Sequence, residues 1–249
     1  MNKIFCRQGS KTDISAKIIN LIPEHDLYVE PFAGGASIYF KKEPSKKEIL
    51  NDKDKDLIKG YRLIKKAKLQ DAKKYDNKEN DPKNDEDIRK LYNQPIKNDV
   101  DRLLYYILKF CNTFNSSGRG QVYKKGQPLT KIRNLEAYKK RVKNTTFLNQ
   151  DYKKIIEKYD GVNTFFYLDP PYEGSKKDKI YNHSIIDYDE LNRILTNIKG
   201  KFILSINDSP NIRNTFKTFR MKKIIIKGKA NKEGSSGHKD RNELIISNF

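Results

Sequence analysis

The residues best suited to chemistry form the run Asp169-Pro170-Pro171-Tyr172, which directly follows the apolar segment 164–168. A short, fully apolar run is typical of a central strand in a parallel sheet, and ligands of such sheets bind at the carboxyl ends of the strands. Consecutive prolines fix the backbone and remove N–H donors. The Pro170 carbonyl and the Asp169 carboxylate can therefore both accept hydrogen bonds from one exocyclic amine.

An amine held by two acceptors has its lone pair directed out of the aromatic plane, where it can attack an electrophilic methyl group. This is catalysis by positioning, and it needs no strong base. The Tyr172 ring offers a surface on which a planar base can stack. We therefore predict that Asp169, Pro170 and Tyr172 carry methyl transfer to an amine; the alternative is a strand that ends in an ordinary Pro-Pro turn.

A second candidate site is the run PFAGGAS, residues 31–37, after an expected strand. Its glycines, Gly34 and Gly35, allow a ligand to approach the backbone closely. The run is not GxGxxG and no P-loop lysine follows, so a nucleoside triphosphate is not expected. Asp52 ends the next expected strand, where a carboxylate can accept both ribose hydroxyls of an adenosine-containing cofactor. The alternative for Asp52 is a solvated loop acid or a helix N-cap.

Both candidate sites need a sheet to position them, and the apolar pattern supplies one. We expect strands at 27–30, 48–50, 146–148, 164–168 and 202–206, then a closing hairpin of 223–227 and 243–247. We expect helices near 12–22, 38–40, 54–68, 99–112, 130–141, 151–159 and 187–198. Residues 70–88 contain almost no apolar side chains, which predicts a surface loop. The order predicts an α/β fold with a mostly helical insertion.

The chain has 249 residues, with 52 Lys and Arg against 32 Asp and Glu, and a formal net charge of +20. Such an excess favours a polyanionic partner, although a lysine-rich proteome would also produce it. Residues 93–150 hold 12 basic and only 3 acidic side chains, which locates much of the excess in the insertion. No apolar run is long enough for a membrane span, and no signal peptide is evident. Cys6 and Cys111 are far apart in sequence, so neither a disulfide nor a Cys-type zinc site is expected.

Together the motifs resemble the Dam-like family of DNA adenine-N6 methyltransferases, over nearly the whole chain. The matching runs are RQGSK (7–11), VEPFAGGAS (29–37), ILNDKD (49–54, for the family's ILxDxN), the Phe114-Asn115 turn, Phe147 to Tyr152, DPPY (169–172), LSIND (204–208) and NELII (242–246). The chain departs from the family at Arg7, where an aromatic residue is usual, and at Ser10, where glycine is usual. Its second glycine in FAGGAS also comes one place earlier than in FxGxGS.

The resemblance implies a Rossmann-like class I methyltransferase sheet with an inserted, mostly helical target-recognition domain. Residues 1–52 and 146–249 would bind S-adenosylmethionine, and 53–145 would bind DNA. The implied cofactor-binding residues are Arg7, Lys11, Phe32, Ala33, Gly34, Gly35, Ser37, Asp52, Asp151 and Asp169. The implied catalytic residues are Asp169, Pro170 and Tyr172. The DNA-binding candidates, chosen from a Gly/Ser-rich turn and the basic segment after it, are Asn115, Ser117, Arg119, Lys124 and Arg133.

The function implied is a site-specific DNA adenine-N6 methyltransferase that transfers methyl from S-adenosyl-L-methionine to a flipped-out adenine. The alternatives are an RNA or protein amino-methyltransferase, because such enzymes use similar motifs, and a DNA-binding relative without activity. We expect double-stranded DNA as the partner, no membrane, no metal, a monomer or weak dimer, and a cytoplasmic location.

Overall fold

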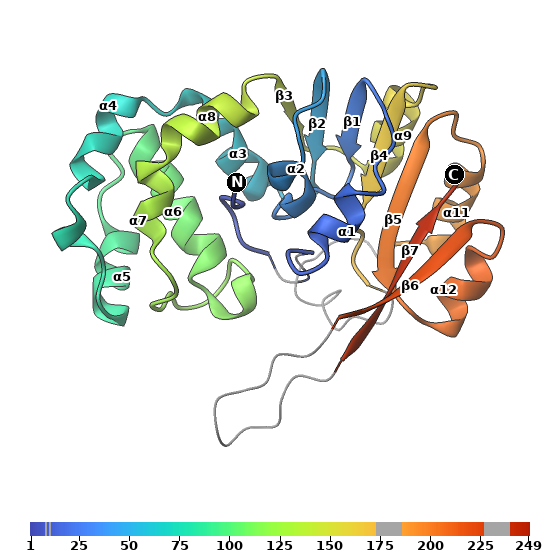
Figure 1. Cartoon of the computed structure of the whole chain (residues 1–249). Helices are drawn as coiled ribbons and strands as arrows, with labels where there is room; N and C mark the ends of the chain where they lie inside the picture. Colours follow the sequence, from blue (N-terminus) through green and yellow to red (C-terminus); the bar gives the residue numbers. More distant parts are fainter. Residues whose placement is uncertain (8, 10, 173–185, 227–239) are drawn as a thin grey trace. The chain divides into compact units, whose positions relative to one another are not determined.

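The computed structural model describes residues 1–7, 9, 11–172, 186–226 and 240–249. It contains a seven-stranded sheet with the strand order β3-β2-β1-β4-β5-β7-β6 (Figure 1). The strands are β1 (Leu27–Glu30), β2 (Lys47–Asn51), β3 (Thr145–Leu148), β4 (Thr164–Leu168), β5 (Lys201–Asn207), β6 (Arg220–Ile226) and β7 (Arg241–Ser247). The reversal of strand order at β1 and β4 is the arrangement of a doubly wound sheet, so the predicted α/β fold class is confirmed.

The strand pairing brings the candidate motifs to one edge of the sheet. β1 pairs in parallel with β2 and β4, and β4 pairs in parallel with β5. The carboxyl ends of β1, β2 and β4 therefore point the same way. All five residues of β4 are buried, as its continuous apolar sequence predicts. The expected hairpin is confirmed as an antiparallel pair of β6 and β7, with β7 also antiparallel to β5.

The helices correspond to most of the predicted segments. They are α1 (Ser15–Ile19), α2 (Ser37–Lys41), α3 (Lys55–Lys66), α4 (Leu69–Ala72), α5 (Asp85–Asn93), α6 (Asp99–Cys111), α7 (Pro128–Arg133), α8 (Leu135–Val142), α9 (Tyr152–Tyr159), α11 (Tyr188–Thr196) and α12 (Pro210–Thr215). The single helix expected at 130–141 is divided at Asn134 into α7 and α8. No helix in the described part of the chain is long and apolar enough to cross a membrane.

The predicted surface loop at 70–88 is wrong, because the segment folds into α4, two turns of 3₁₀ helix and the start of α5. Two features hold this polar segment in place. Asn84 and Asp87 form a reciprocal capping box at the start of α5. The buried Tyr75 donates a 2.8 Å hydrogen bond to the carboxylate of Asp101. Capping and a few buried contacts thus replace the apolar periodicity that the sequence lacks.

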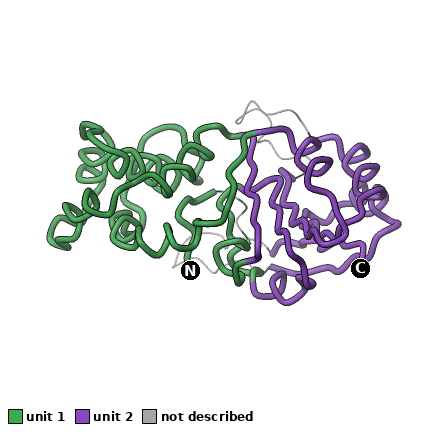
Figure 2. Tube along the Cα trace, turned by 90° about the horizontal axis from the view of Figure 1, so that it is seen from above, with its two compact units in different colours: residues 1–15, 34–44, 54–149 green, residues 16–33, 45–53, 150–249 purple. Residues whose placement is uncertain are grey.

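The chain divides into two compact units, whose segments alternate along the sequence (Figure 2). The first unit comprises residues 1–15, 34–44 and 54–149, and the second comprises residues 16–33, 45–53 and 150–249. In the first unit, the Phe5 ring packs edge-on against Tyr61 at 4.9 Å and Phe110 at 5.7 Å. In the second, α9, α11 and α12 cover one face of the strands and α1 lies on the other (Figure 1). A target-recognition domain at 53–145 stays a prediction.

The structure corrects the prediction for the cysteines, because Cys6 and Cys111 are joined by a disulfide within the first unit. Ile4 and Phe5 are fully buried, and the N-terminal segment thereby packs against the end of α6. The sequence separation of 105 residues concealed this contact. Lys131 lies beside the bridge and donates a 2.6 Å hydrogen bond to the Ile4 carbonyl. Burial lowers the pKa of Lys131 to about 7.

Candidate active site

The carboxyl ends of β1 and β2 are held together by the side chain of Asn51, which is 1% exposed. Its Nδ2 donates to the carbonyls of Pro31 (2.9 Å) and Gln150 (3.0 Å), and its Oδ1 accepts from the Gln150 amide at 2.9 Å. The Asn51 carbonyl accepts from the Ala33 amide at 2.8 Å. The motif after β1, the end of β2 and the turn before α9 are therefore fixed to one another. Sequence reasoning missed Asn51, although a buried amide beside Asp52 at a strand end was the available signal.

This connection brings three of the predicted cofactor residues into one region of the second unit. Phe32 follows Pro31, Asp52 follows Asn51, and Asp151 follows Gln150. The Phe32 ring lies 4.9 Å from the ring of Tyr152, and Asp151 caps α9 by accepting from the Lys153 amide at 3.0 Å. Asp52 and Asp151 are both partly exposed. An aromatic ring and two partly exposed carboxylates, which accept hydrogen bonds, suit a nucleoside.

The DPPY run begins directly after β4, as predicted. Asp169 and Tyr172 are partly exposed, whereas Pro170 is buried. The Tyr172 hydroxyl contacts both carboxylate oxygens of Glu243, at 2.7 and 2.6 Å. Glu243 lies on β7 and is 1% exposed. Sequence reasoning did not assign Glu243 a role, although a carboxylate within the apolar strand NELII was a signal that could have identified it.

The glycine motif continues into the first unit, and its backbone explains the altered glycine spacing. Ala36, which stands where the family's FxGxGS has its second glycine, adopts a left-handed conformation with φ 51°. Gly35 is needed for a different reason, because a Cβ there would lie 2.9 Å from the Phe5 carbonyl oxygen. Gly34 has φ 49°, and its carbonyl accepts a 2.8 Å hydrogen bond from Tyr61. Ser37 is the first residue of α2.

The two basic residues of the first motif are both largely buried in the first unit. Lys11 is 3% exposed, and its Nζ donates to the Gly9 carbonyl at 3.1 Å. Arg7 pairs with Asp54 and faces the 113–120 segment. Ser10, one of the departures from the family, lies outside the described residues.

The DNA-binding candidates differ from one another in exposure and in contacts. Arg119 is exposed, and its amide donates to the Ser117 hydroxyl at 3.2 Å. The Lys124 amine donates to the Gly126 carbonyl and to the Gln127 side chain, at 2.9 and 3.1 Å. The side chain of Asn115 lies outside the described residues.

Arg133 is the candidate with the most intramolecular contacts. Its Nε donates to the Tyr75 carbonyl at 2.8 Å, and its guanidinium forms an ion pair with Asp81. These contacts anchor the segment between α4 and α5, and a DNA contact by Arg133 stays a prediction. Sequence reasoning overlooked Phe114, whose side chain is 72% exposed beside the Gly/Ser-rich turn. An aromatic residue directly before the Asn-Ser-Ser-Gly run was the signal.

Metal ligation has no support within the residues that the structure describes, because they contain no group of three or more His, Cys, Asp or Glu side chains arranged to hold an ion.

Comparison with known proteins gives one family and three relatives, all of them DNA methyltransferases or described as type II methyltransferases. A family model described as D12 class N6 adenine-specific DNA methyltransferase matches residues 8–229. The type II methyltransferase M.MjaIII of Methanocaldococcus jannaschii is 25% identical, with 97% of this chain and 96% of the relative covered. M.CviBI of Paramecium bursaria Chlorella virus NC1A is 27% identical over 87% of this chain and 86% of the relative. M1.LlaDCHI of Lactococcus lactis subsp. cremoris is 26% identical over 97% and 93%.

Proposed function

Because the chain belongs to the D12 class N6 adenine-specific DNA methyltransferase family, we propose that it binds S-adenosyl-L-methionine at the carboxyl edge of its sheet and methylates a flipped-out adenine in double-stranded DNA. The observation that carries this proposal is the DPPY run directly after the fully buried β4. The family match favours DNA adenine over the RNA and protein substrates considered above. It likewise favours an enzyme over an inactive relative, and the intact Asp169 and Tyr172 support that choice.

The aromatic ring and the carboxylates of the second unit fit the proposed cofactor. Phe32, Ala33, Asp52 and Asp151 are held near one another through Asn51. The Asp52 carboxylate suits the ribose hydroxyls, the Asp151 carboxylate suits the adenine amine, and the Phe32 ring suits the apolar faces. Asp169 lies in the same unit, whereas a cofactor role for Lys11, Gly34, Gly35 and Ser37 of the first unit stays a prediction. The contacts of Arg7, also in the first unit, favour another role. When bound, S-adenosylmethionine supplies the electrophilic methyl group.

The chain's own contribution to the reaction is orientation of the target amine. The Asp169 carboxylate and the Pro170 carbonyl accept the two N6 hydrogens, which leaves the nitrogen lone pair directed out of the ring plane. The Tyr172 ring stacks on the adenine, and Glu243 fixes that ring through its hydroxyl. The carboxylate of Asp169 also stabilises the positive charge that develops on the nitrogen.

DNA binding is assigned to the 53–145 segment as a target-recognition domain. Residues 93–150 contain 12 basic and only 3 acidic residues, and the exposed basic side chains among them supply phosphate contacts. Arg119, Ser117 and Asn115 lie in a turn whose neighbour Phe114 is exposed, which gives both polar and stacking contacts to bases. Basic residues elsewhere on the segment position the duplex, whereas this turn reads it. We propose a monomer or weak dimer that acts in the compartment holding the DNA.

The decisive experiment is long-read sequencing of modified bases in DNA from cells that express the chain. We expect N6-methyladenine at every copy of one short sequence, and none in cells that express the Asp169→Ala variant. Methylation of cytosine, or unmodified DNA from cells with verified soluble protein, would contradict the proposal. The same data give the recognition sequence, which is needed for the binding experiments below.

A further inference from the structure

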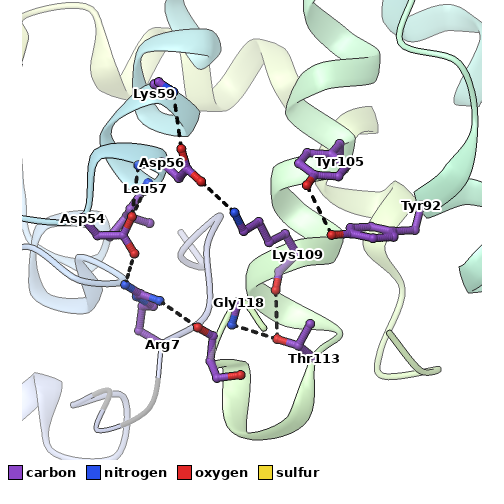
Figure 3. Close-up of polar contacts among 11 residues, drawn as sticks. Arg7, Asp54, Asp56, Leu57, Lys59, Tyr92, Tyr105, Lys109, Thr113 and Gly118 are labelled. Atoms are coloured by element: carbon purple, nitrogen blue, oxygen red, sulfur yellow. Dashed lines mark hydrogen bonds and ion pairs between the residues drawn. The ribbon is translucent and has the colours of Figure 1, made fainter. Parts of the chain in front are cut away.

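Arg7 occupies a family position where an aromatic residue is usual, and its surroundings in the first unit indicate a different task from cofactor stacking. Its Nη2 forms an ion pair with Asp54, and its Nη1 donates to the Ser117 carbonyl at 3.4 Å (Figure 3). The guanidinium carbon lies 5.0 Å from the centroid of the Phe110 ring. We propose that Arg7 and Asp54 form a positioning pair that sets the 113–120 turn for base recognition. This inference rests on the proposed function, because it assumes that the turn contacts DNA.

Asp54 serves two partners through its two carboxylate oxygens. Oδ1 accepts from the amides of Asp56 (3.0 Å) and Leu57 (3.1 Å), and so caps α3. Oδ2 faces Arg7 (Figure 3). The side chains of Arg7 and Asp54 are only 12% and 20% exposed, so solvent screens this ion pair less than a surface pair. The start of α3 therefore provides a fixed point against which Arg7 is oriented.

The turn contacts this pair through Arg7 and is also held by hydrogen bonds of its own. The Gly118 amide donates to the Thr113 hydroxyl at 3.0 Å, and that hydroxyl donates to the Lys109 carbonyl at 2.9 Å (Figure 3). A Cβ at Gly118, which has φ 77°, would lie 3.1 Å from the Phe110 ring and 3.8 Å from Arg7 Nη1. Gly118 is thus required both for its backbone conformation and for this close approach. Thr113 holds the turn through the Gly118 amide, and Arg7 holds it through the carbonyl of the preceding residue, Ser117.

The backbone next to Arg7 is anchored independently of its side chain. Cys6 is joined to Cys111 at the end of α6, and Phe5 is fully buried. Arg7 is therefore presented from a fixed backbone to both α3 and the turn. The sequence departures agree with this arrangement: the family's ILxDxN run ends in Asn where this chain has Asp54, and Arg7 replaces an aromatic residue. Both exchanges concern residues that contact each other.

Asp54 neutralises the guanidinium of Arg7, so the pair acts on DNA through geometry and not through charge. Loss of either partner should relax the turn and weaken discrimination between DNA sequences. It should leave the number of phosphate contacts, and therefore the slope of log Kd against log salt concentration, unchanged. Loss of an ordinary phosphate-binding arginine would reduce that slope and affect all sequences equally.

The experiment compares Arg7→Gln and Asp54→Asn with the wild type and with Lys59→Gln. Asp54→Asn keeps an oxygen that can cap α3, removes the charge, and replaces the oxygen that accepts from Arg7 with an amide donor. Like Arg7→Gln, Lys59→Gln removes one positive charge. Lys59 lies on α3, and its exposed amine pairs with Asp56 at 3.4 Å. Each protein is titrated with a duplex that contains the methylated sequence, with duplexes altered at one base pair, and with S-adenosylmethionine alone.

We expect Arg7→Gln and Asp54→Asn each to raise Kd for the cognate duplex about tenfold and to reduce discrimination against the altered duplexes. Kd for S-adenosylmethionine should stay within about twofold of the wild type, and Lys59→Gln should discriminate normally. The positioning role is overturned if Arg7→Gln weakens S-adenosylmethionine binding and leaves discrimination intact, or if both variants discriminate like the wild type. If a thermal melt shows that Arg7→Gln is unfolded, the result for Asp54→Asn alone decides whether the pair has the positioning role. A wild-type protein that binds neither S-adenosylmethionine nor duplex refutes the proposed function instead.

Discussion

The carboxyl edge of the sheet and the 113–127 segment hold their candidate residues in different ways. At the sheet edge, the buried amide of Asn51 holds the backbone at Pro31 and Gln150, and Glu243 accepts from the Tyr172 hydroxyl. In the 113–127 segment, a short 3₁₀ turn (Phe114–Ser116), an isolated bridge between Thr113 and Val122, and a few side-chain contacts hold the turn. Chemistry that requires sub-ångström placement is therefore expected on the sheet, and recognition that adapts to a partner is expected on the turn.

The largest expected effect is at Asp169. Replacement by Ala removes one of the two acceptors that orient the amine, so kcat should fall at least about 10²–10³-fold while DNA affinity changes little. Single-turnover methyl transfer and duplex titration measure the two quantities separately. Asp189→Ala, which removes an exposed carboxylate from α11, is the matched control. Normal turnover in Asp169→Ala would remove the sheet edge from the mechanism.

The second largest effect is expected from loss of the contact between Tyr172 and Glu243. A hydrogen bond to a charged group contributes about 1.5–3 kcal/mol, so Tyr172→Phe and Glu243→Ala should each lower kcat about 10- to 100-fold, with the aromatic ring retained in both. Because both variants break the same contact, the double variant should be scarcely slower than the slower single variant. Fully additive losses would show that Glu243 does not act through Tyr172.

In the first unit, Lys131 should make stability depend on pH. Its folded-state pKa of about 7 lies below the ordinary lysine value of 10.5, so the unfolded chain binds more protons between these values. The free energy of unfolding therefore rises with pH in this window, and the full penalty for burying the charge is present below it. Urea unfolding at pH 7.0 and 8.5 should show a gain of about 1–2 kcal/mol that Lys131→Met lacks and that the exposed-site variant Lys140→Met retains. Equal gains in all three proteins would contradict the assignment.

The smallest effect is expected for single residues of the turn and the basic segment after it. Wild-type DNA affinity should fall steeply with salt, and Arg119→Gln should raise Kd only a few-fold while reducing the salt slope by about one. Arg133→Gln removes the same charge, but from the ion pair with Asp81, so we expect it to lower the melting temperature and to leave the salt slope unchanged. A reduced slope for Arg133→Gln would instead establish Arg133 as a phosphate contact.

The same contrast explains which parts of the molecule were predictable from sequence. β1 and β4 have the predicted bounds, because Pro31 directly follows β1 and Asp169-Pro170 directly follows β4, so the end of each strand is marked in the sequence. DPPY and Asp52 follow strand ends as expected. The residues that were missed, Asn51 and Glu243, are polar side chains whose partners lie far away in sequence. A local pattern marks both as unusual polar residues at a strand, but it does not identify their partners, because the contacts arise only when the strands assemble.

The first unit was less predictable because its order depends on tertiary contacts. The segment 70–88 lacks apolar periodicity, and its helical turns are held by Asp101, by Arg133 and by a capping box. The disulfide between Cys6 and Cys111 joins positions with no sequence relation. Arg7 was recognisable as a departure from the family, but its partner Asp54 became evident only from the structure.

The alternation of the two units along the chain restricts how this enzyme can exchange its proposed recognition segment with a relative. Replacing residues 54–149 alone would leave behind residues 1–15 and 34–44, which belong to the same compact unit. Phe5 would lose the rings of Tyr61 and Phe110, and Cys6 would lose Cys111. A chimera that keeps its fold must therefore transplant three separate stretches together. Recombination between relatives is thus expected to succeed only when the N-terminal residues are exchanged together with the segment that we propose reads the DNA.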